Sequence, residues 1–482
     1  MVSKKTKKRI SFGIIALFVF SIIMYGGISA TGWIYAGGIE LINPITEFST
    51  DNTFSDESDS AVPTEKAIVD GIATTDSKLR TSMLSSLGIS EAINSWENTN
   101  SNPDITVQGD IEDYIKRIRV VTLNDDGAIT QECADYNNQE IDCITDGTKG
   151  QVMVEFPKLY YKETVDGDNN LEKVEVSSFA LPGYKLHPCF SWGNGRDKIY
   201  IGAFEAGHDG TALTSVSGVA TRTDRTLAEY RSEAIARKSG ATQADSNWHS
   251  YGFWQHHLIE LLFYSYYDTR NSQSALAGYT EASSYDASYK RNTGRTINLT
   301  TINGNVDADL SGTDSDLSSV LDSGDKIANR FLWIENIFGH IWKFTDGVIY
   351  VPTSSVGVSG WTGDFQAVYH TPDPRLWSSS DADIESDYDK LDVTPYATSS
   401  DSYIKKVGKG FVPTDGGASS STYWTDNYWA HLTDGGRAYL RSVRVGGSLD
   451  HGGWAGLGSR LSATALSYSS SAIGSRLCYS EI

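Results

Sequence analysis

Residues 445–479, near the carboxyl end of the chain, read VGGSLDHGGWAGLGSRLSATALSYSSSAIGSRLCY. Glycine, serine and alanine fill most of this segment, a composition that is typical of loops. Single residues of very different chemistry interrupt it, namely Asp450, His451, Trp454, Arg460 and Tyr468. The segment then ends in IGSRL, which has the pattern of a half-buried strand. The pattern predicts a loop-rich region of mixed chemistry that regular structure holds at both ends.

The stretches upstream of this region carry helix and strand patterns. The stretch FWQHHLIELLFYSYY at residues 253–267 is apolar on nearly every face, which predicts a helix buried in the core. LAEYRSEAIARKSG at residues 227–240 predicts another helix, and KIYIGAFEA at residues 198–206 predicts a strand. Together they predict an α+β domain that spans residues 182–482.

A smaller β-rich unit is predicted before that domain, over residues 105–181. Three stretches in it alternate apolar and polar residues, namely IKRIRVV, QVMVEFPKLYYKETV and EKVEVSSF. The turn sequences DDG, DGTKG and DGDNN separate these stretches. This arrangement is typical of antiparallel strands that are joined by tight turns.

The amino-terminal region, residues 1–40, combines a basic cluster with a long apolar run. Its basic residues are Lys4, Lys5, Lys7, Lys8 and Arg9, and residues 10–39 contain no charged residue. A signal peptide has an apolar core of about 7–15 residues and a spanning helix needs about 20, so the length favours a transmembrane helix. Basic residues on its amino side predict that the carboxyl-terminal domain lies outside the cell. A cleaved signal peptide that ends at residues 28–30, and hence a secreted protein, is the alternative.

Residues 41–104 are predicted to link this segment to the folded part of the chain. The stretch STDNTFSDESDSAVPTEK at residues 49–66 is rich in serine and aspartate and poor in apolar residues, which predicts a solvated stalk. Residues 67–96 show weak helical periodicity and predict a short neck. This neck is a candidate for homo-oligomer formation.

The charge of the chain disfavours nucleic acid as a partner. The 61 acidic and 40 basic residues give a formal net charge of −21. Proteins that bind nucleic acid usually carry a basic face, and the only basic cluster here precedes the apolar run. The 482 residues, 39% of them hydrophobic, are enough to build two or three domains with real cores.

Four cysteines suit an exported protein. Cys133 and Cys143 lie close together within ECADYNNQEIDC and are expected to close a small disulfide loop. Cys189 and Cys478 are expected to be buried apolar residues, with a second disulfide as the alternative. The spacings match neither CxxC nor a Cys/His zinc site.

Three stretches of the chain, taken together, resemble one family. NIFGHIWKFTDG at residues 336–347 resembles the N-x-F-G-N-x-W-E-W motif of the formylglycine-generating-enzyme type of C-type lectin fold. RSVRVGGSLDHGG, followed later by IGSRL, resembles the R-G-G-S-W…I-G-F-R-L pattern that closes this fold, and FWQHHLIELLFYSYY occupies the place of its second helix. The match is closer to the variable proteins of diversity-generating retroelements, which are found in phage tails and on bacterial and archaeal surfaces. It covers about residues 150–479.

The resemblance implies both a fold and a binding site. In these variable proteins, the segment between V-G-G and I-G-S-R-L is rewritten at adenine-containing template codons. The implied fixed frame is Gly446, Gly447, Ile473, Gly474, Arg476 and Leu477. The implied ligand-binding positions are Ser448, Asp450, His451, Trp454, Thr464, Tyr468, Ser470 and Ala472, with Ser459 and Arg460 as further candidates. Tyrosine and tryptophan supply rigid contact area while serine and glycine adapt, as in antibody loops.

These features predict a non-enzymatic receptor or adhesin at the cell surface, whose ligand is an unknown extracellular protein or glycan. The alternative is the receptor-binding tip of a phage or virus tail fibre. A formylglycine-generating oxidase is disfavoured because that chemistry needs two cysteines near the closing segment, where this chain has only Cys478. We expect no cofactor.

Other candidate sites have simpler explanations. His256 and Glu260 share one face of the predicted helix and His257 adjoins them, but no third metal ligand is evident and their neighbours are apolar. The acidic stretch at residues 305–319 lacks the spacing of an EF-hand loop. VGVSG at residues 356–360 lacks the strand and helix that flank a nucleophile elbow. We therefore predict neither a metal site nor a catalytic residue.

Overall fold

The computed structural model describes four long stretches of the chain in full, residues 111–353, 361–420, 424–433 and 439–481. Elsewhere it describes the backbone of five short strands, β1 (Tyr35–Ala36), β2 (Ile39–Glu40), β3 (Glu47–Ser49), β4 (Ala61–Pro63) and β5 (Asp104–Gln108). The predicted neck, and most of the predicted transmembrane segment and stalk, lie outside the described residues. Within the described stretches, no helix is both long and apolar enough to cross a membrane. The chain divides into two compact units, and the larger one, Asn94–Val107 with Ile111–Ile482, carries every feature discussed below.

The first large sheet joins the two regions that the sequence analysis assigned to separate units. In spatial order, its strands are β15 (Trp248–Ser250), β28 (Leu477–Tyr479), β12 (Lys198–Gly202), β8 (Gln151–Pro157), β6 (Arg119–Leu123) and β7 (Ile129–Ala134). All neighbours are antiparallel, and β12 pairs with β8 on one side and with β28 on the other. Residues 105–181 and 182–482 therefore share one sheet, because β12 of the second region pairs with β8 of the first.

The second large sheet has nine strands and carries the carboxyl-terminal segment. Eight follow the order β21 (Asp389–Leu391), β20 (Val368–His370), β19 (Trp342–Tyr350), β25 (Arg441–Gly446), β26 (Gly456–Ala465), β24 (Asn427–Trp429), β22 (Ser402–Val407) and β23 (Pro413–Gly416). The ninth, β27 (Ile473–Gly474), runs parallel to β19, and β24 runs parallel to β26. β19 and β25 are buried at every residue. β25, which precedes the carboxyl-terminal segment, thus lies between β19 and β26, and β27, which follows it, pairs with β19.

The remaining elements confirm a mixed α+β architecture. The smaller sheets contain β11 (Lys185–Leu186), β9 (Tyr160–Val165), β10 (Leu171–Ser177) and β5; β13 (Gly207–His208) and β14 (Leu213–Thr214); and β16 (Gly304–Asp307), β17 (Lys326–Phe331) and β18 (Ile334–Glu335). The helices are α5 (Ile111–Ile115), α6 (Pro188–Ser191), α7 (Leu227–Ile235), α8 (Phe253–Tyr267), α9 (Ser272–Ala275) and α10 (Asp381–Asp387). Short 3-10 turns are η1 (Ala287–Tyr289), η2 (Ser315–Leu317), η3 (Pro374–Leu376), η4 (Lys409–Phe411) and η5 (Gly452–Trp454). The C-type-lectin assignment stays a prediction.

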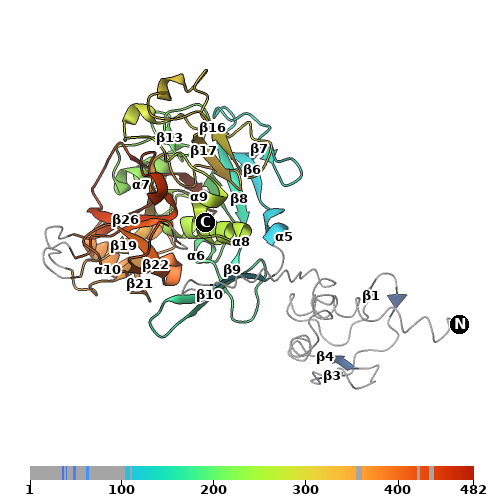
Figure 1. Cartoon of the computed structure of the whole chain (residues 1–482). Coiled ribbons are helices and arrows are strands. Elements are labelled where there is room, and N and C mark those ends of the chain that lie inside the picture. The colour runs from blue at the N-terminus through green and yellow to red at the C-terminus, as the bar shows by residue number, and fades with distance from the viewer. Residues whose placement is uncertain are drawn as a thin grey trace. The chain divides into compact units, whose positions relative to one another are not determined.

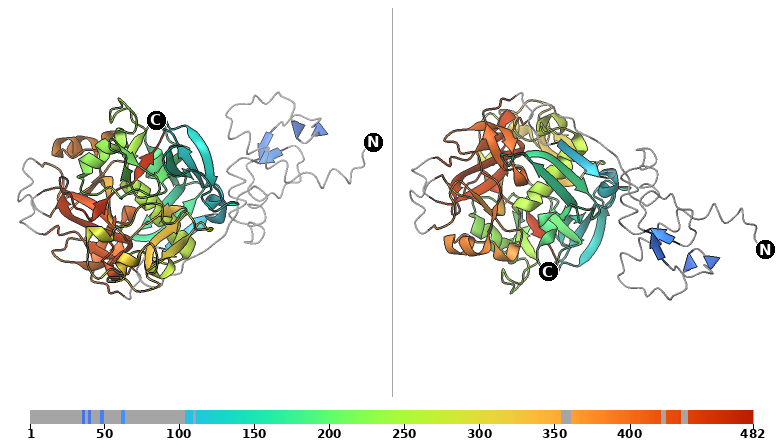
Figure 2. Two further views of the ribbon diagram at one scale, coloured as in Figure 1. Left: turned by 90° about the horizontal axis from the view of Figure 1, so that it is seen from above. Right: turned by 90° about the horizontal axis from the view of Figure 1, so that it is seen from below.

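The predicted buried helix is confirmed as α8. It spans residues 253–267, and all but its last two residues are buried. In Figure 1 it lies in the middle of the larger unit, where it packs against β19, α5 and α6. Both views of Figure 2 show the cyan strands β6 and β7 and the orange-red strands of the second large sheet on opposite sides of this unit.

Two other local predictions have clear outcomes. The helix predicted at residues 227–240 is shorter than expected, since α7 ends at Ile235, and it begins with a capping box between Thr226 and Glu229. Cys133 and Cys143 form the expected disulfide, and Cys189 and Cys478 are buried free cysteines.

Candidate functional site

β25 and β26 form the hairpin that carries the predicted variable segment. Gly446 pairs with Gly456, so residues 447–455 form the connecting loop. Gly447 has a φ of +77°, and a Cβ there would lie 2.6 Å from Cβ of Ala455. Any other residue would be strained and would collide with the far end of the loop. Gly447 therefore closes the loop, as its predicted place in the frame requires.

The far end of the segment returns to the same sheet. β27 places Ile473 beside Trp342 of β19, and the Trp342 amide donates a hydrogen bond of 2.9 Å to the Ala472 carbonyl. The hydroxyl of Tyr230 donates to the Ile473 carbonyl at 2.8 Å. Buried strands thus hold both ends of residues 447–472, which we call the display segment.

Seven of the ten predicted ligand-binding residues reach the surface. Trp454 is 42% exposed and Tyr468 is 41% exposed. The partly exposed members are Asp450, His451, Thr464, Ser470 and Ala472. We call these seven residues the display face. Their exposure agrees with the predicted role, and ligand binding itself stays a prediction.

The other three predicted binding residues are buried, which corrects their assignment to a displayed surface. Ser448 and Arg460 are each 1% exposed, and Ser459 is 0% exposed. The Ser448 hydroxyl donates to Oδ1 of Asp450 at 2.7 Å, and the Ser459 hydroxyl donates to the Trp454 carbonyl at 2.6 Å. The two serines therefore shape the loop from inside.

Two parts of the display segment meet over Trp342 and Arg444. The ring of His451, in the first loop, packs edge-on against Trp342 with 5.1 Å between the ring centres. The Arg444 guanidinium lies 5.8 Å from the centre of the Trp342 ring and 5.3 Å from that of Tyr468, in the second loop. Trp454 instead lies edge-on to Tyr403, with 6.2 Å between the ring centres. Trp342 and Arg444 thus form a shared floor beneath His451 and Tyr468.

Arg460 forms a buried ion pair beneath the hairpin. Its Nη2 lies 2.7 Å from Oε2 of Glu260, both side chains are 0% exposed, and its Nη1 donates to the Gly458 carbonyl at 3.2 Å. The helix residues that were weighed as metal ligands have other partners. Glu260 pairs with Arg460, and Nε2 of His256 donates to the Leu457 carbonyl at 2.9 Å.

The acidic stretch at residues 305–319 has a similar explanation. Asp314 is buried, and its carboxylate lies 2.7 Å from Arg295 and 3.8 Å from Arg291. Two arginine side chains, rather than a metal ion, therefore balance the charge of Asp314. Among the residues that the structure describes, no group of three or more histidine, cysteine, aspartate or glutamate side chains is placed to hold a metal ion.

A second buried carboxylate, Asp426, holds the start of β26. Its Oδ2 accepts a hydrogen bond of 2.7 Å from the Gly458 amide. A Cβ at Gly456 would lie 2.0 Å from Oδ1, and a Cβ at Gly458 would lie 2.9 Å from Oδ2. Both positions are glycine because the carboxylate occupies this space. Burial raises the pKa of Asp426 to about 8 and that of Glu260 to about 7.

We expect the free energy of unfolding to fall by about 1–2 kcal/mol between about pH 6.5 and about pH 8. Aspartate in the unfolded chain titrates near pH 3.9, so folded Asp426 holds a proton that the unfolded chain has lost. This contribution to stability is present at low pH and disappears as the pH rises through about 8. Urea unfolding at both pH values measures the loss. Asp426→Asn keeps an acceptor for Gly458 and should flatten the dependence, whereas equal slopes would contradict the assignment.

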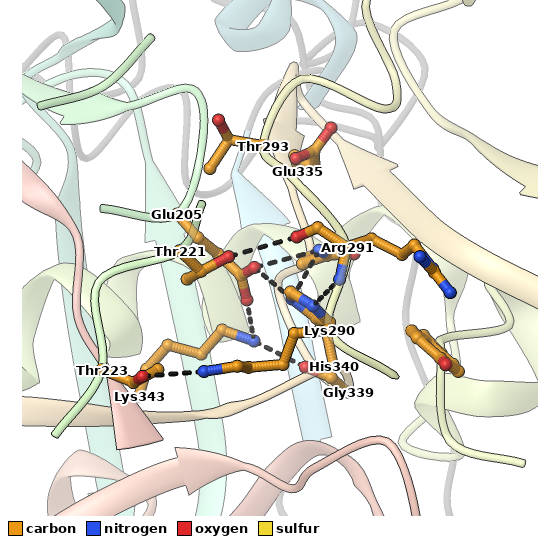
Figure 3. A network of polar contacts seen from close by, with 12 residues as sticks. Glu205, Thr221, Thr223, Lys290, Arg291, Thr293, Glu335, Gly339, His340 and Lys343 are labelled. Atoms are coloured by element: carbon orange, nitrogen blue, oxygen red, sulfur yellow. Dashed lines mark hydrogen bonds and ion pairs between the residues drawn. The ribbon is translucent and has the colours of Figure 1, made fainter. Parts of the chain in front are cut away.

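A third buried charged cluster underlies the motif at residues 336–347 (Figure 3). Glu205 accepts a hydrogen bond from Nδ1 of His340 and lies 2.9 Å from Nζ of Lys343. All three side chains are 1% exposed. Burial raises the pKa of Glu205, but the contacts with His340 and Lys343 outweigh it and hold that pKa well below its usual value. Burial lowers the pKa of Lys343 to about 8.

This cluster fixes the turn that supports the first loop of the display segment. Nζ of Lys343 donates to the Gly339 carbonyl at 2.7 Å. The Gly339 amide donates to the Gly446 carbonyl at 2.9 Å, and the Leu449 amide donates to the His340 carbonyl at 3.0 Å. Two backbone hydrogen bonds thus connect the charged cluster to the loop, so the cluster positions the display face from below.

Sequence reasoning missed three residues of this site, Glu205, Asp426 and Arg444. Each is a charged residue beside strand-like sequence, and charged residues are seldom fully buried without a partner. That signal marks them as unusual. It does not identify their surroundings, since Glu205 lies more than a hundred residues from His340 and Lys343 in the chain.

We expect simultaneous replacement of Asp450, His451, Trp454 and Tyr468 by alanine to change the free energy of unfolding by at most about 1 kcal/mol. These side chains are exposed or partly exposed, whereas the hairpin is held by its buried strands. Urea unfolding of the wild type and the fourfold variant provides the comparison. Loss of the folded state would mean that the display face carries part of the fold.

Comparison with known proteins adds little to these observations. No family model matches the chain, and no curated protein sequence matches it. Among solved structures, the chain is similar to a Major Tropism Determinant P3c Variant, with 10% sequence identity and a TM-score of 0.25. The match covers 79% of this chain and 74% of that chain. Similarity at this level shows neither the family nor the function of the chain.

Proposed function

We propose that this chain is a ligand-binding receptor or adhesin that is displayed on a cell surface, and that the display face is its binding site. One observation carries the proposal: exposed side chains of several chemical kinds lie on loops whose two ends are fixed by buried strands. Exposed tryptophan and tyrosine are typical of binding hot spots. A rigid frame also lets loop side chains change without loss of the fold.

We also propose that a retroelement diversifies the display segment. The exposed positions form two groups, at residues 450–454 and 464–472, and the buried residues 455–463 separate them, as exchange of surface residues on a constant frame requires. The genome offers a direct test. We expect a near-copy of the codons for residues 445–477 beside a reverse transcriptase gene, with differences only at adenines. A complete genome without such a copy would rule out diversification by a retroelement.

A pair of display libraries tests ligand binding. The first library randomises the seven residues of the display face, and the second randomises the three buried positions Ser448, Ser459 and Arg460. Protease resistance should be kept by most members of the first library and by few members of the second. Selection of the first library on fluorescent lysozyme, as a probe protein, should yield binders. A folded first library without binders would contradict the proposal.

Cell fractionation separates the surface receptor from a tail-fibre tip. A surface receptor should pellet with membranes, and protease added to intact cells should remove its carboxyl-terminal domain. A virion protein should instead copurify with particles. Recovery only in the soluble fraction of the cell would exclude the surface receptor.

A further inference from the structure

Arg444, in the floor of the display face, is a buried cation without an acidic partner. The residue is 9% exposed, and its Nε has no hydrogen-bond partner. Across the described stretches, no carboxylate lies within ion-pairing distance of this guanidinium, whereas buried Arg231 pairs with Asp346 and buried Arg460 pairs with Glu260. Burial of a charge costs free energy unless an opposite charge or hydrogen bonds compensate for it. This arginine therefore requires an explanation.

The surroundings of Arg444 place it directly beneath the surface. It lies on β25 opposite Phe344 of β19 and Leu461 of β26. The rings of Trp342 and Tyr468 flank the guanidinium, and the Tyr468 ring is itself 41% exposed. Burial lowers the pKa of Arg444 to about 10, although the hydrogen bond with the Tyr468 hydroxyl opposes this shift.

We propose that Arg444 is a constant anion-binding residue of the display face, and that it takes an oxyanion of the ligand: a carboxylate, sulfate or phosphate group. This inference rests on the proposed function and adds the chemical class of the ligand. A guanidinium presents planar donors that match two oxygens of such a group. In Arg444, a hydrogen bond with Tyr468 uses part of this capacity, and no carboxylate neutralises the charge. Arg444 precedes residues 445–477, so every diversified variant would retain it.

A second cation adjoins the other loop of the display segment. Nζ of Lys290 lies 2.8 Å from the Thr223 hydroxyl and 3.4 Å from the Ser471 carbonyl (Figure 3). Lys290 thus adds positive charge beside a segment of a protein whose net charge is −21. Asp450 of the display face and Asp224 beside Lys290 are acidic, so an anionic group of the ligand would be attracted by the two cations rather than by a generally basic surface.

Thermal unfolding with simple anions tests this inference without a known ligand. Sulfate and acetate should raise the melting temperature of the wild-type chain more than chloride does at the same ionic strength. The increase should be smaller in Arg444→Met, where only the general stabilisation by excluded salts remains. It should be intermediate in Arg444→Lys and unchanged in Arg117→Met, a matched change at an exposed arginine. In chloride, Arg444→Met should melt at or above the wild-type temperature, because it removes an unpaired buried charge. Equal anion responses in wild type and Arg444→Met would overturn the inference.

Two pairs of probes identify the source of the oxyanion. Sialyllactose with lactose tests an acidic glycan, and hexaglutamate with hexaglutamine tests an acidic peptide. The inference is supported if one acidic probe binds, its neutral partner does not bind, and Arg444→Met weakens the binding at least about tenfold. The probe that binds then identifies the source of the oxyanion. Absence of Arg444-dependent binding for all four probes overturns it.

The library selection tests the general binding function, and the anion measurements test the role of Arg444, so either proposal can be refuted without the other. If the first library yields lysozyme binders but the anion response does not depend on Arg444, only the anion-binding role is refuted. If the anion response depends on Arg444 but the folded library yields no binders, only the general binding function is refuted.

Discussion

Replacement of Arg460 by methionine is expected to lower the free energy of unfolding by about 2–3 kcal/mol at about pH 8.5, where Glu260 is ionised beside Arg460. Methionine fills much of the same space, but it removes the cation that lies 2.7 Å from Glu260 and the hydrogen bond to the Gly458 carbonyl. Glu260 then stays in the interior without a partner, or it must take up a proton. Urea unfolding of the purified variant measures the loss.

The pH dependence of this loss identifies its cause. Glu260 takes up a proton more easily at about pH 5 than at about pH 8.5, so the destabilisation by Arg460→Met should shrink at pH 5. Arg117→Met is the matched control, since Arg117 is exposed, and should change stability by less than about 0.5 kcal/mol. A loss below about 1 kcal/mol for Arg460→Met would return this residue to the candidates for the display face.

Replacement of Glu205 by glutamine should also cost about 3–5 kcal/mol. Glutamine keeps the shape of the side chain but leaves Lys343 buried without the carboxylate that lies 2.9 Å from it. The turn at residues 336–347 should loosen, and with it the hydrogen bonds from Gly339 and Leu449 that support the first loop. Urea unfolding reports the loss of stability, and hydrogen exchange at the Leu449 amide reports the local effect.

The acid side of the stability profile provides a second readout for Glu205. Contacts with His340 and Lys343 keep the pKa of folded Glu205 below its value of about 4.3 in the unfolded chain. Its contribution is therefore complete above about pH 4.3 and is lost as the pH falls through the folded pKa. Glu205→Gln should lack this part of the acid transition, and Glu172→Gln, a matched change at an exposed glutamate, should keep it. Identical acid profiles for the two variants would contradict the role of Glu205.

These predictions separate two kinds of residue within one short segment. Trp454 and Tyr468 are large, exposed and expected to be replaceable. Arg460 has the same mixed-chemistry sequence surroundings, yet it belongs to the interior. Diversification at Arg460 would therefore change the stability of the protein before it changed a ligand. Diversification at Trp454 would change the surface, and diversification at Tyr468 would also change the surroundings of Arg444.

Patterns with a local cause were predictable. The buried helix at residues 253–267 follows from the even distribution of apolar residues around its axis, and the Cys133–Cys143 disulfide follows from short separation in a turn-rich stretch. The end of α7 at Ile235 was missed because helix propensity continues beyond the last packed turn. The exposure of Trp454 and Tyr468 also agreed with expectation, since bulky residues among glycines and serines find few partners in their own loop.

The sequence by itself determined the buried helix, the small disulfide loop and the mixed chemistry of the display segment. It did not predict β26, a ten-residue strand within that segment. Only the tertiary structure decided which of those side chains face solvent. Glu205, Asp426 and Glu260 meet His340, Gly458 and Arg460 through the packing of elements that are remote in sequence. Glu260 reaches Arg460 from helix α8, and Asp426 lies beside Gly458 where β24 pairs with β26. Local pattern reflects interactions between near neighbours, whereas the burial of a charge depends on partners that only the folded sheet brings within a few ångströms.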